Sequence, residues 1–470
     1  MILRPYQQAA LADITLAFAS GHRRVVLRSP TASGKTVLFA EQTRLWPGSV
    51  LIVAHRRELI RQASAKLGRL PHGIIAPGFQ RTADRVQVAS VQTLARRDVR
   101  QFDHIILDEC QHAVAGTWLK LLEGQPDARV LGVTATPSRL DGRGLGEVFQ
   151  YLVEGPQIAG LVADGYLKRT RVFAPPPKFD AASLHTLGGD YRTDEVTAAI
   201  DKPGITGDVV EHYRDLVPGQ PAVVFCASVA HAEHVAETFA AAGWRSGAVH
   251  GALPERDRDR LILGLGTGEI EVLTSCALID EGLDVPAISV VIDLAPTQSL
   301  VKFLQRAGRG MRPAPTSGPG AGIHELTILD HVGNATLRHG LPDAPREWSL
   351  EGRPKRGDVA VAVRQCPSCY AAHTPAPVCP ACGHVYAVDK AAEAKKLIVR
   401  DGTLVEVGLI EALPPLGEQL KEAKTYEDVE RIRVQRGYKR GWTMHIMRFK
   451  SGGGARPVSN GFDDFGVSAA

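Results

Sequence analysis

The sequence lacks a long hydrophobic run. None of its apolar stretches approaches the roughly 18 consecutive residues that a membrane-spanning helix needs. The N-terminus, MILRPYQQAA, also lacks the charged and then apolar build of a secretory signal peptide. These two absences predict a cytoplasmic protein that does not interact with a membrane.

The sequence also lacks a large excess of charge of either sign, and it contains few cysteines. The formal net charge is only +4 over 470 residues, which is too small to indicate a nucleic-acid partner without local clustering. The seven cysteines are an odd number, which argues against a disulfide framework. Cys110, Cys226 and Cys276 are scattered, and we expect them to be buried thiols. The remaining composition, 44% apolar and 23% charged, is typical of a globular protein with room for about three domains.

Two parts of the chain alternate short apolar runs with helix-like segments. The runs of the first part are VVL at 25–27, VLIVA at 50–54, VQVAS at 86–90, IIL at 105–107 and VLGVT at 130–134. A second set, AVVFCAS, SGAVHG, IEVLTS, SVVIDLA and HELTILD, begins near residue 220. Continuous apolar strands that alternate with helices indicate a parallel sheet covered on both faces. We therefore predict an α/β protein with two parallel-sheet domains.

Shifts in composition predict the domain boundaries. We expect the two sheet domains at residues 1–165 and 201–345, with a Pro- and Gly-rich connector at 166–200, a cysteine-rich module at 346–390 and a basic C-terminal region at 391–470. Residues 431–450 hold seven lysines or arginines and no acidic residue, interleaved with Tyr438, Trp442 and Phe449. This pattern suits contacts to a nucleic-acid backbone with base stacking. An amphipathic, solvated helix explains it equally well.

The segment SPTASGKT at 29–36 indicates a phosphate-binding loop. It follows the apolar run VVL and precedes a helix-like stretch, which is the context that such a loop needs. Its backbone N–H groups would point inward, and the helix N-terminus would add partial positive charge. Lys35 would reach the β- and γ-phosphates, and the hydroxyl of Thr36 would bind Mg²⁺. The alternative is a chance Gly-Lys-Thr turn.

A second segment, FDHIILDECQH at 102–112, ends an apolar run in two carboxylates. Adjacent acids are costly to desolvate unless a positive charge lies beside them. Strands that end at Arg28 and Leu107 would both stop at the carboxyl edge of one parallel sheet, where ligands bind in open α/β folds. Asp108 would then face the same Mg²⁺ as Thr36, and Glu109 would polarise the water that attacks the γ-phosphate. Alternatively, both acids cap the following helix.

Seven segments resemble, in order, the motifs of the superfamily 2 helicases of the DEAD/DEAH type. They are RPYQQ at 4–8, PTASGKT at 30–36, AHRREL at 54–59, DECQ at 108–111, TATP at 134–137, TSCALIDEGLDVP at 274–286 and QRAGRGMR at 305–312. Two positions depart from the family pattern: Ala32 stands where a glycine is more usual, and Gln111 stands where Asp or His is expected. The resemblance covers about the first 340 residues and implies two RecA-like domains in tandem, with ATP between them.

The resemblance also implies a role for individual residues. Arg309 and Arg312 would be arginine fingers that stabilise charge on the transferred phosphoryl group, and Gln305 would hold the water or the γ-phosphate. Gln7 would read the adenine edge, and Asp284 would bind the ribose. The full set of predicted ATP-binding residues is Arg4, Gln7, Thr31, Ser33, Gly34, Lys35, Thr36 and Asp284. The predicted nucleic-acid contacts are His55, Arg56, Ser90, Thr93, Gly251 and Thr274, although Ser90 and Thr93 could instead cap a helix.

The segment CPSCYAAHTPAPVCPACGH indicates a structural zinc site. Cys366, Cys369, Cys379 and Cys382 form two C-x-x-C pairs separated by nine residues, which supply the four thiolates of a closed tetrahedral shell. The rival interpretation is a redox dithiol. His373 is expected to be a bystander, as is the histidine at 384.

The order of these parts resembles the RadD branch of DNA-repair helicases and its phage relatives. LDHVGNATLRHG, REWSL, the cysteine pairs and the basic GYKRGW tail carry that resemblance. It implies an ATP-dependent DNA helicase or translocase that acts in repair, recombination or phage replication. Its partners would be single-stranded or branched DNA, with repair or replication proteins bound through the module or the tail. Two alternatives are an RNA helicase and a nucleotide-switched DNA-binding adaptor with little unwinding activity.

Overall fold

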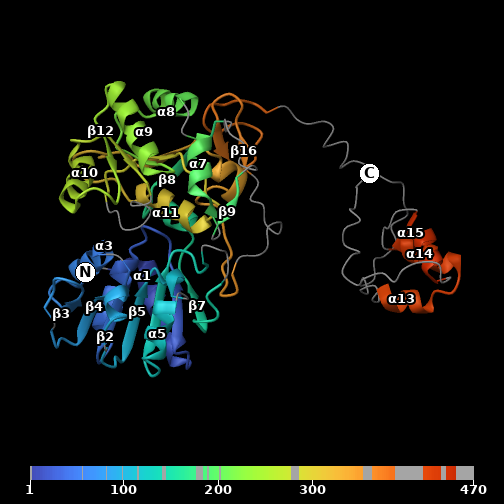
Figure 1. The fold of residues 1–470 in the computed structure, drawn as a ribbon, viewed down its shortest axis with the longest axis horizontal. Coiled ribbons are helices and arrows are strands. Elements are labelled where there is room, and N and C mark those ends of the chain that lie inside the picture. Colours follow the sequence, from blue (N-terminus) through green and yellow to red (C-terminus); the bar gives the residue numbers. More distant parts are fainter. Residues whose placement is uncertain are drawn as a thin grey trace. The chain divides into compact units, whose positions relative to one another are not determined.

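The computed structural model describes residues 3–55, 57–80, 82–97, 99–113, 116–139, 144–175, 184–187, 190–200, 203–276, 285–352, 363–386, 416–435 and 441–450. The chain divides into two compact units, residues 1–388 and 389–470 (Figure 1). Within the described part of the chain, no helix has both the length and the apolar character needed to cross a membrane.

The first domain contains a seven-stranded sheet in the order β3-β4-β2-β5-β6-β1-β7, and all neighbouring strands are parallel. Its strands are β1 (Arg24–Arg28), β2 (Val50–Ala54), β3 (His72–Ile75), β4 (Val86–Ser90), β5 (His104–Asp108), β6 (Arg129–Thr134) and β7 (Tyr151–Glu154). The helical elements are α1 (Pro5–Ala19), α2 (Lys35–Leu45), α3 (Arg57–Leu67), α4 (Val91–Leu94), η1 (Cys110–His112) and α5 (Gly116–Glu123). The predicted parallel α/β fold is confirmed for this part.

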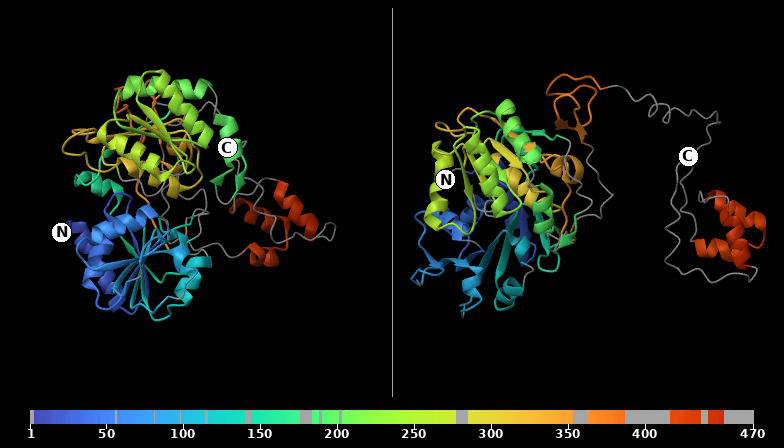
Figure 2. Two further views of the ribbon diagram at one scale, coloured as in Figure 1. Left: turned by 60° about the vertical axis from the view of Figure 1, so that its left-hand side comes forward. Right: turned by 45° about the horizontal axis from the view of Figure 1, so that its top comes forward.

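Continuous apolar strands are explained by helices on both faces of this sheet, as Figure 2 shows. Val25 and Leu27 of β1 point into a core with α1, α2 and α3. Val26, between them, points into a separate core with α4 and α5. Successive residues of a strand face opposite sides, so a strand buried on both sides needs apolar residues at every position.

The second domain contains an eight-stranded sheet in the order β12-β13-β11-β14-β15-β8-β17-β16. The strands from β12 to β8 pair in parallel, and β17 and β16 are antiparallel additions. The strands are β8 (Arg169–Phe173), β11 (Ala222–Phe225), β12 (Ser246–Val249), β13 (Val272–Ser275), β14 (Val290–Asp293), β15 (Glu325–Asp330), β16 (Arg364–Gln365) and β17 (Ala371–His373). The helices are α6 (Ile158–Ala163), α7 (Thr193–Ile200), α8 (Pro203–Leu216), α9 (Val229–Ala241), α10 (Glu255–Thr267), α11 (Leu300–Gly310) and the π-helix η3 (Asn334–His339). Two short strands, β9 (Thr186–Leu187) and β10 (Asp190–Tyr191), form a separate antiparallel pair.

Two segments that the sequence separates from the second domain belong to its sheet. β8 lies inside the expected connector at 166–200 but pairs with β15. β17, which follows the first cysteine pair, pairs with β8 in turn. The cysteine-rich module is therefore built onto the edge of the second sheet.

Residues 341–352 form a strap that follows the second domain and packs against the first. The backbone carbonyl of Leu350 accepts a hydrogen bond from Gly146, and the Leu350 side chain packs against the core beside α4 and α5. The guanidinium of Arg28, the last residue of β1, lies 5.0 Å from the ring centre of Trp348. Burial lowers the pKa of Arg28 to about 10, with partial opposition from the nearby Glu154 carboxylate, so Arg28 stays charged at neutral pH. The strap therefore touches the residue directly before the phosphate loop.

The second compact unit is described over α13 (Leu416–Glu422), α14 (Tyr426–Gln435) and α15 (Gly441–Lys450). Its apolar core contains Val429, Ile432 and Ile446, and Trp442 packs against that core. The buried hydroxyl of Thr443 donates a hydrogen bond to the α14 carboxylate of Glu430, which ties α14 to α15. The ring of Trp442 therefore contributes to packing, whereas Tyr438 lies outside the described residues.

Candidate nucleotide, nucleic-acid and metal sites

The phosphate loop connects β1 to α2 and is held together from inside. The hydroxyl of Ser33 donates to the carbonyl of Pro30 at 2.6 Å and lies 2.7 Å from the Ser29 hydroxyl. Ser33 is fully buried, so its hydroxyl shapes the loop and is not exposed for a ligand. Gly34 has a φ of 85° and Ala32 a φ of 67°. This left-handed conformation favours glycine, which explains why a glycine suits position 32.

Helix α1 supports the loop from one side. The phenol of Tyr6 and the amide nitrogen of Gln7 both donate to the backbone carbonyl of Ser33, at 2.6 and 3.2 Å. The amide oxygen of Gln7 accepts a bond from the backbone N–H of Arg4. Gln7 therefore links α1 to the loop, and its contact to an adenine stays a prediction. The Arg4 guanidinium lies 4.7 Å from the ring centre of Tyr166, which also packs against the Tyr6 ring.

The paired carboxylates lie at the carboxyl edge of the sheet, as the sequence predicts. Asp108 ends β5, and Glu109 follows it with a φ of 50°, in a conformation unusual for a residue with a side chain. The ammonium of Lys35, the first residue of α2, lies 3.8 Å from the Glu109 carboxylate. Both side chains are about nine-tenths buried, at 10% and 11% exposure. Lys35 thereby supplies the positive charge that buried carboxylates at this edge require.

Gln111 connects Glu109 to the next motif. Its amide nitrogen donates to Glu109 at 3.0 Å, and its amide oxygen accepts a hydrogen bond from the Thr134 hydroxyl at 2.7 Å. Gln111 is buried, and Thr134 ends β6, the strand between β5 and β1. The amide is suited to this place because it can donate to a carboxylate and accept from a hydroxyl at the same time.

Helix α11 of the second domain reaches the phosphate loop. A Cβ atom built on Gly308 would lie only 2.4 Å from Cβ and Cγ2 of Thr31. Gln305 and Arg309 lie on the same helix and are buried, whereas Arg312 follows the helix and is half-buried. The structure thus brings the segment that carries the predicted arginine fingers to the loop that is predicted to bind phosphate.

A neighbouring arginine of α11 has a different role. Arg306 pairs with the Asp293 carboxylate at 2.9 Å and donates to the carbonyl of Ala295, and all these groups are buried. The same Asp293 accepts a bond from Asn334. Asp293 and burial together raise the pKa of the adjacent Asp330 carboxyl to about 6, with burial the larger cause. Arg306 therefore anchors α11 to its own sheet.

We expect Gly308→Ala to reduce ATP hydrolysis by at least about tenfold, because small displacements of catalytic groups have large effects on rate. The three atoms nearest to the added methyl all belong to Thr31, so the second domain itself can still fold. Steady-state ATPase rates and thermal unfolding would measure the two effects separately. Thr31→Gly removes the atoms that collide, so the double variant should recover activity towards that of Thr31→Gly alone. A normal rate for Gly308→Ala would contradict a close approach of α11 to the loop.

Three of the predicted nucleic-acid contacts line one hollow of about 370 Å³ on the first domain: His55, Ser90 and Thr93. Ser90 precedes α4 but makes no capping bond, because its hydroxyl donates to the side chain of Gln92. Gln92 in turn donates to the backbone carbonyl of His55. Arg96 and Arg97 also line this hollow, which we call the central hollow. Sequence reasoning missed both arginines, although they lie three and four residues after the predicted contact Thr93.

The other predicted contacts are placed differently. Gly251 is exposed after β12. Thr274 is fully buried, and its hydroxyl donates to the carbonyl of Ala232 at 2.6 Å, so it does not present a group to a phosphate. The prediction for this side chain is therefore not supported: its position inside β13 turns the hydroxyl onto α9. The predicted contacts of Arg56 and Asp284 lie outside the described residues.

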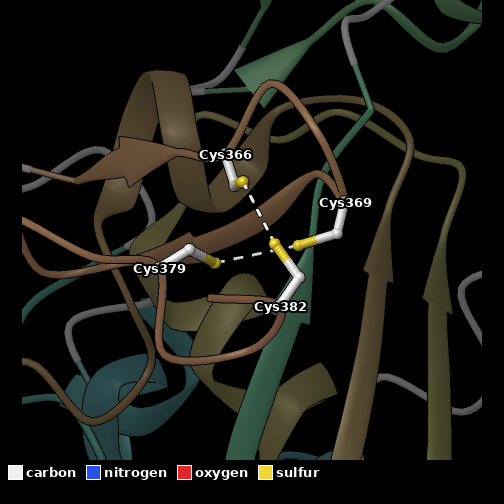
Figure 3. A group of neighbouring side chains, drawn as sticks. All are labelled: Cys366, Cys369, Cys379 and Cys382. Carbon is white, nitrogen blue, oxygen red and sulfur yellow. Dashed lines mark hydrogen bonds between the residues drawn. The ribbon is translucent and has the colours of Figure 1, made fainter. Parts of the chain in front are cut away.

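The four predicted metal ligands converge on one point (Figure 3). Their sulfur atoms all lie within 4.8 Å of one another, with Cys366 and Cys382 at 3.7 Å and Cys369 and Cys379 at 3.8 Å. Four thiolates at 2.3 Å from a tetrahedral zinc ion would be about 3.8 Å apart. The cluster could therefore hold a metal ion with little rearrangement.

The two halves of the cluster are built alike. The N–H of Tyr370 donates to the carbonyl of Cys366, and the N–H of Gly383 donates to that of Cys379. Tyr370 and Gly383 both have positive φ angles, 59° and 75°, which close each turn after its cysteine pair. Both ring nitrogens of His373 have protein partners, the carbonyl of Thr374 and the phenol of Tyr386. This arrangement agrees with the expected role of His373 as a bystander.

Family models match both sheet domains. The model described as the res subunit of type III restriction enzymes matches residues 1–139, and the model of the helicase conserved C-terminal domain matches residues 208–314. A 51.5 kDa protein of a Lactococcus phage is 33% identical over 384 residues, which cover 79% of this chain and 80% of the phage protein. The putative ATP-dependent helicase IRC3 of Saccharomyces cerevisiae is 27% identical and covers 73% of this chain. The chain spans only about half, 53%, of that yeast protein.

Solved structures share the fold at low sequence identity. A fragment of a putative HsdR subunit of a type I restriction enzyme from Vibrio vulnificus matches with a TM-score of 0.58 and 20% identity, over 76% of this chain and 68% of the other. The type ISP restriction-modification enzyme LlaBIII, bound to DNA, matches with a TM-score of 0.52 and 15% identity, over 70% of this chain and 27% of the other. With a restriction-enzyme res-subunit model in the first sheet domain, a helicase C-terminal model in the second and a phage relative aligned along most of both chains, this protein belongs to the superfamily 2 helicases.

Proposed function

We propose that this superfamily 2 protein is an ATP-driven motor that moves along DNA or remodels it, in DNA repair, recombination or phage replication. The observation that carries the proposal is the approach of α11 to the phosphate loop, with Gly308 against Thr31. A nucleotide site with groups from two domains allows ATP binding and hydrolysis to change how those domains are arranged. A nucleic acid held by both domains would then be moved.

The residues around the loop fit ATP with Mg²⁺. Thr31 Oγ1 and Gln305 Nε2 are buried and have no hydrogen-bond partner among the described residues, so each has capacity left for a phosphate oxygen or a water. The hydroxyl of Thr36 and the carboxylate of Asp108 are oxygen donors, the ligands that Mg²⁺ prefers, and would hold the ion. Bound Mg²⁺ would neutralise part of the phosphate charge.

Lys35 and Glu109 have complementary tasks in this proposal. The Lys35 ammonium binds the phosphates, which compete for it with the Glu109 carboxylate 3.8 Å away. Glu109 orients the attacking water and accepts its proton, while Gln111 donates to the carboxylate oxygen that Lys35 does not contact. Arg309 and Arg312 supply positive charge for the transferred phosphoryl group from the second domain.

Support for DNA as the nucleic acid comes from the relatives. The model that matches residues 1–139 describes a restriction-enzyme subunit, and LlaBIII shares the fold in a complex with DNA. The central hollow combines hydroxyl, imidazole and guanidinium groups, which suit phosphates without reading sequence. These groups could therefore hold the backbone of a strand whose base sequence at the site changes as the motor moves.

ATPase rates should be measured with single-stranded DNA, forked DNA and RNA of the same sequence. The proposal expects DNA to stimulate hydrolysis at least about tenfold, with little effect of RNA, and strand displacement from the fork. Glu109→Gln controls for contaminating ATPases. Stimulation by RNA alone would identify an RNA helicase. DNA-stimulated hydrolysis without strand displacement would indicate a translocase or a nucleotide-switched adaptor.

A further inference from the structure

The central hollow shares a lining residue with two further hollows on the first domain. Arg97 lines all three. One neighbour, of about 590 Å³, lies between α4 and α5 and is lined by Lys120 and Gln125. The other, of about 180 Å³, lies beside β3 and β4 and is lined by Arg100 and Gln87. We call these two the outer hollows.

The charged residues described in the linings of the outer hollows are all cations. Arg97, Arg100 and Lys120 are exposed, and the other polar residues described in the two linings are amides and hydroxyls, with no carboxylate among them. The Arg100 guanidinium is fixed in place, because it donates to the carbonyl of Asp84 at 2.6 Å and lies 4.9 Å from the ring centre of Phe102. A held guanidinium among neutral donors is suited to phosphate oxygens.

The described residues of these linings offer no surface for stacking bases. Among the lining residues described, Phe102 is the only aromatic residue. It is only 4% exposed, and the Arg100 guanidinium covers its ring. Proteins that hold single strands pair their cations with accessible aromatic rings. Cations without such rings favour a backbone whose bases are already paired and stacked.

We propose that the outer hollows bind the phosphate backbone of a duplex arm that continues from the strand held in the central hollow. This proposal rests on the proposed function and specifies its substrate as a junction between single- and double-stranded nucleic acid. Arg97 lies where the three hollows meet and contacts the backbone at the junction. Arg100 and Lys120 contact it further along the duplex.

The test uses the double variant Arg100→Gln/Lys120→Gln, which leaves the central hollow unchanged. Its affinity for a forked DNA and for the matching single strand would be measured by fluorescence anisotropy between 50 and 200 mM salt. Each lost duplex phosphate contact lowers the salt slope by about 0.9. We therefore expect the slope for the fork to fall by about two and its affinity at low salt to fall at least about tenfold, with single-strand affinity within about twofold of the parent.

A matched control is Lys66→Gln/Arg69→Gln, which removes two exposed cations of the same domain outside these hollows. Equal losses in the control, equal losses on the single strand, or no loss on the fork would each overturn the proposal. Should the double variant fail to fold, Lys120→Gln alone, at an exposed site, should lower the fork slope by about one. A parent protein that binds neither DNA would contradict the proposed function itself, not the assignment of the outer hollows.

Discussion

Lys35→Ala and Glu109→Gln should each reduce ATP hydrolysis by at least about a hundredfold, but only Lys35→Ala should weaken ATP binding. The expected loss for Glu109→Gln matches the typical contribution of a positioned general base. Lys35 lies in the phosphate loop and is proposed to bind phosphate, so its removal should affect both ATP binding and hydrolysis. Glu109 is proposed only to orient and deprotonate water.

The ion pair between these two side chains gives a further reason to expect different effects on ATP binding. Glu109 lies 3.8 Å from Lys35 in a largely buried place, so its negative charge competes with phosphate for the ammonium. Glu109→Gln removes that competitor and should leave ATP affinity unchanged or raise it. Filter binding or a fluorescent ATP analogue would measure affinity, and steady-state assays would measure turnover. Glu147→Gln, at an exposed carboxylate of the same domain, is the control. Equal loss of ATP binding in both variants would contradict the separate roles.

Most of the strands that could be predicted from the sequence are buried on both faces, although β12 is only partly buried. β1, β2, β4, β5 and β6 have continuous apolar runs and were identifiable on that basis alone. Sequence reasoning missed β3, β7 and β8, because HGII, YLVE and RTRVF are each partly exposed, and the last two carry charged residues. β7 lies at the edge of its sheet. β8 lies between β15 and the short strand β17. Only the last two residues of β8 are buried, so its sequence contains no long apolar run.

The residues of the candidate site also divide into those whose positions could be predicted from the sequence and those whose positions could not. The positions of residues within one contiguous motif, such as Lys35 and Glu109, could be predicted from local pattern and from the common edge of the sheet. Contacts between distant segments could not, because no local pattern records them. The strap that brings Trp348 to Arg28, and the approach of Gly308 to Thr31, depend on how the two domains pack. The inward hydroxyl of Thr274 was missed for the same reason, since a threonine in a strand can face either side.

Cys379→Ser should abolish metal binding at the four-cysteine cluster, which we expect to hold one Zn²⁺ per chain. In small sites of this kind the free energy of metal binding is the free energy of folding. The sequence alone suggests that loss of the metal would unfold only the cysteine-rich module. The structure changes that expectation, because β17 pairs with β8, and Cys366 and Cys379 pack in the same apolar core as Phe173 of β8. Loss of the metal should therefore lower the thermal unfolding midpoint of the second domain as well, by roughly 5 °C or more.

Basal ATP hydrolysis should nevertheless survive below that lowered midpoint. Helix α11 packs on one face of the second sheet, and the cysteines pack on the other. The groups of α11 that we propose to reach ATP are thus separated from the cluster by a sheet with its own apolar core. Zinc content by elemental analysis, thermal unfolding and ATPase rates at low temperature would test each step. Cys276→Ser, outside the cluster, should keep its zinc. Parent protein purified without chelator that contains no zinc would refute the metal assignment. Zinc loss accompanied by loss of low-temperature ATPase would show instead that the β8 edge needs β17 for the second domain to fold.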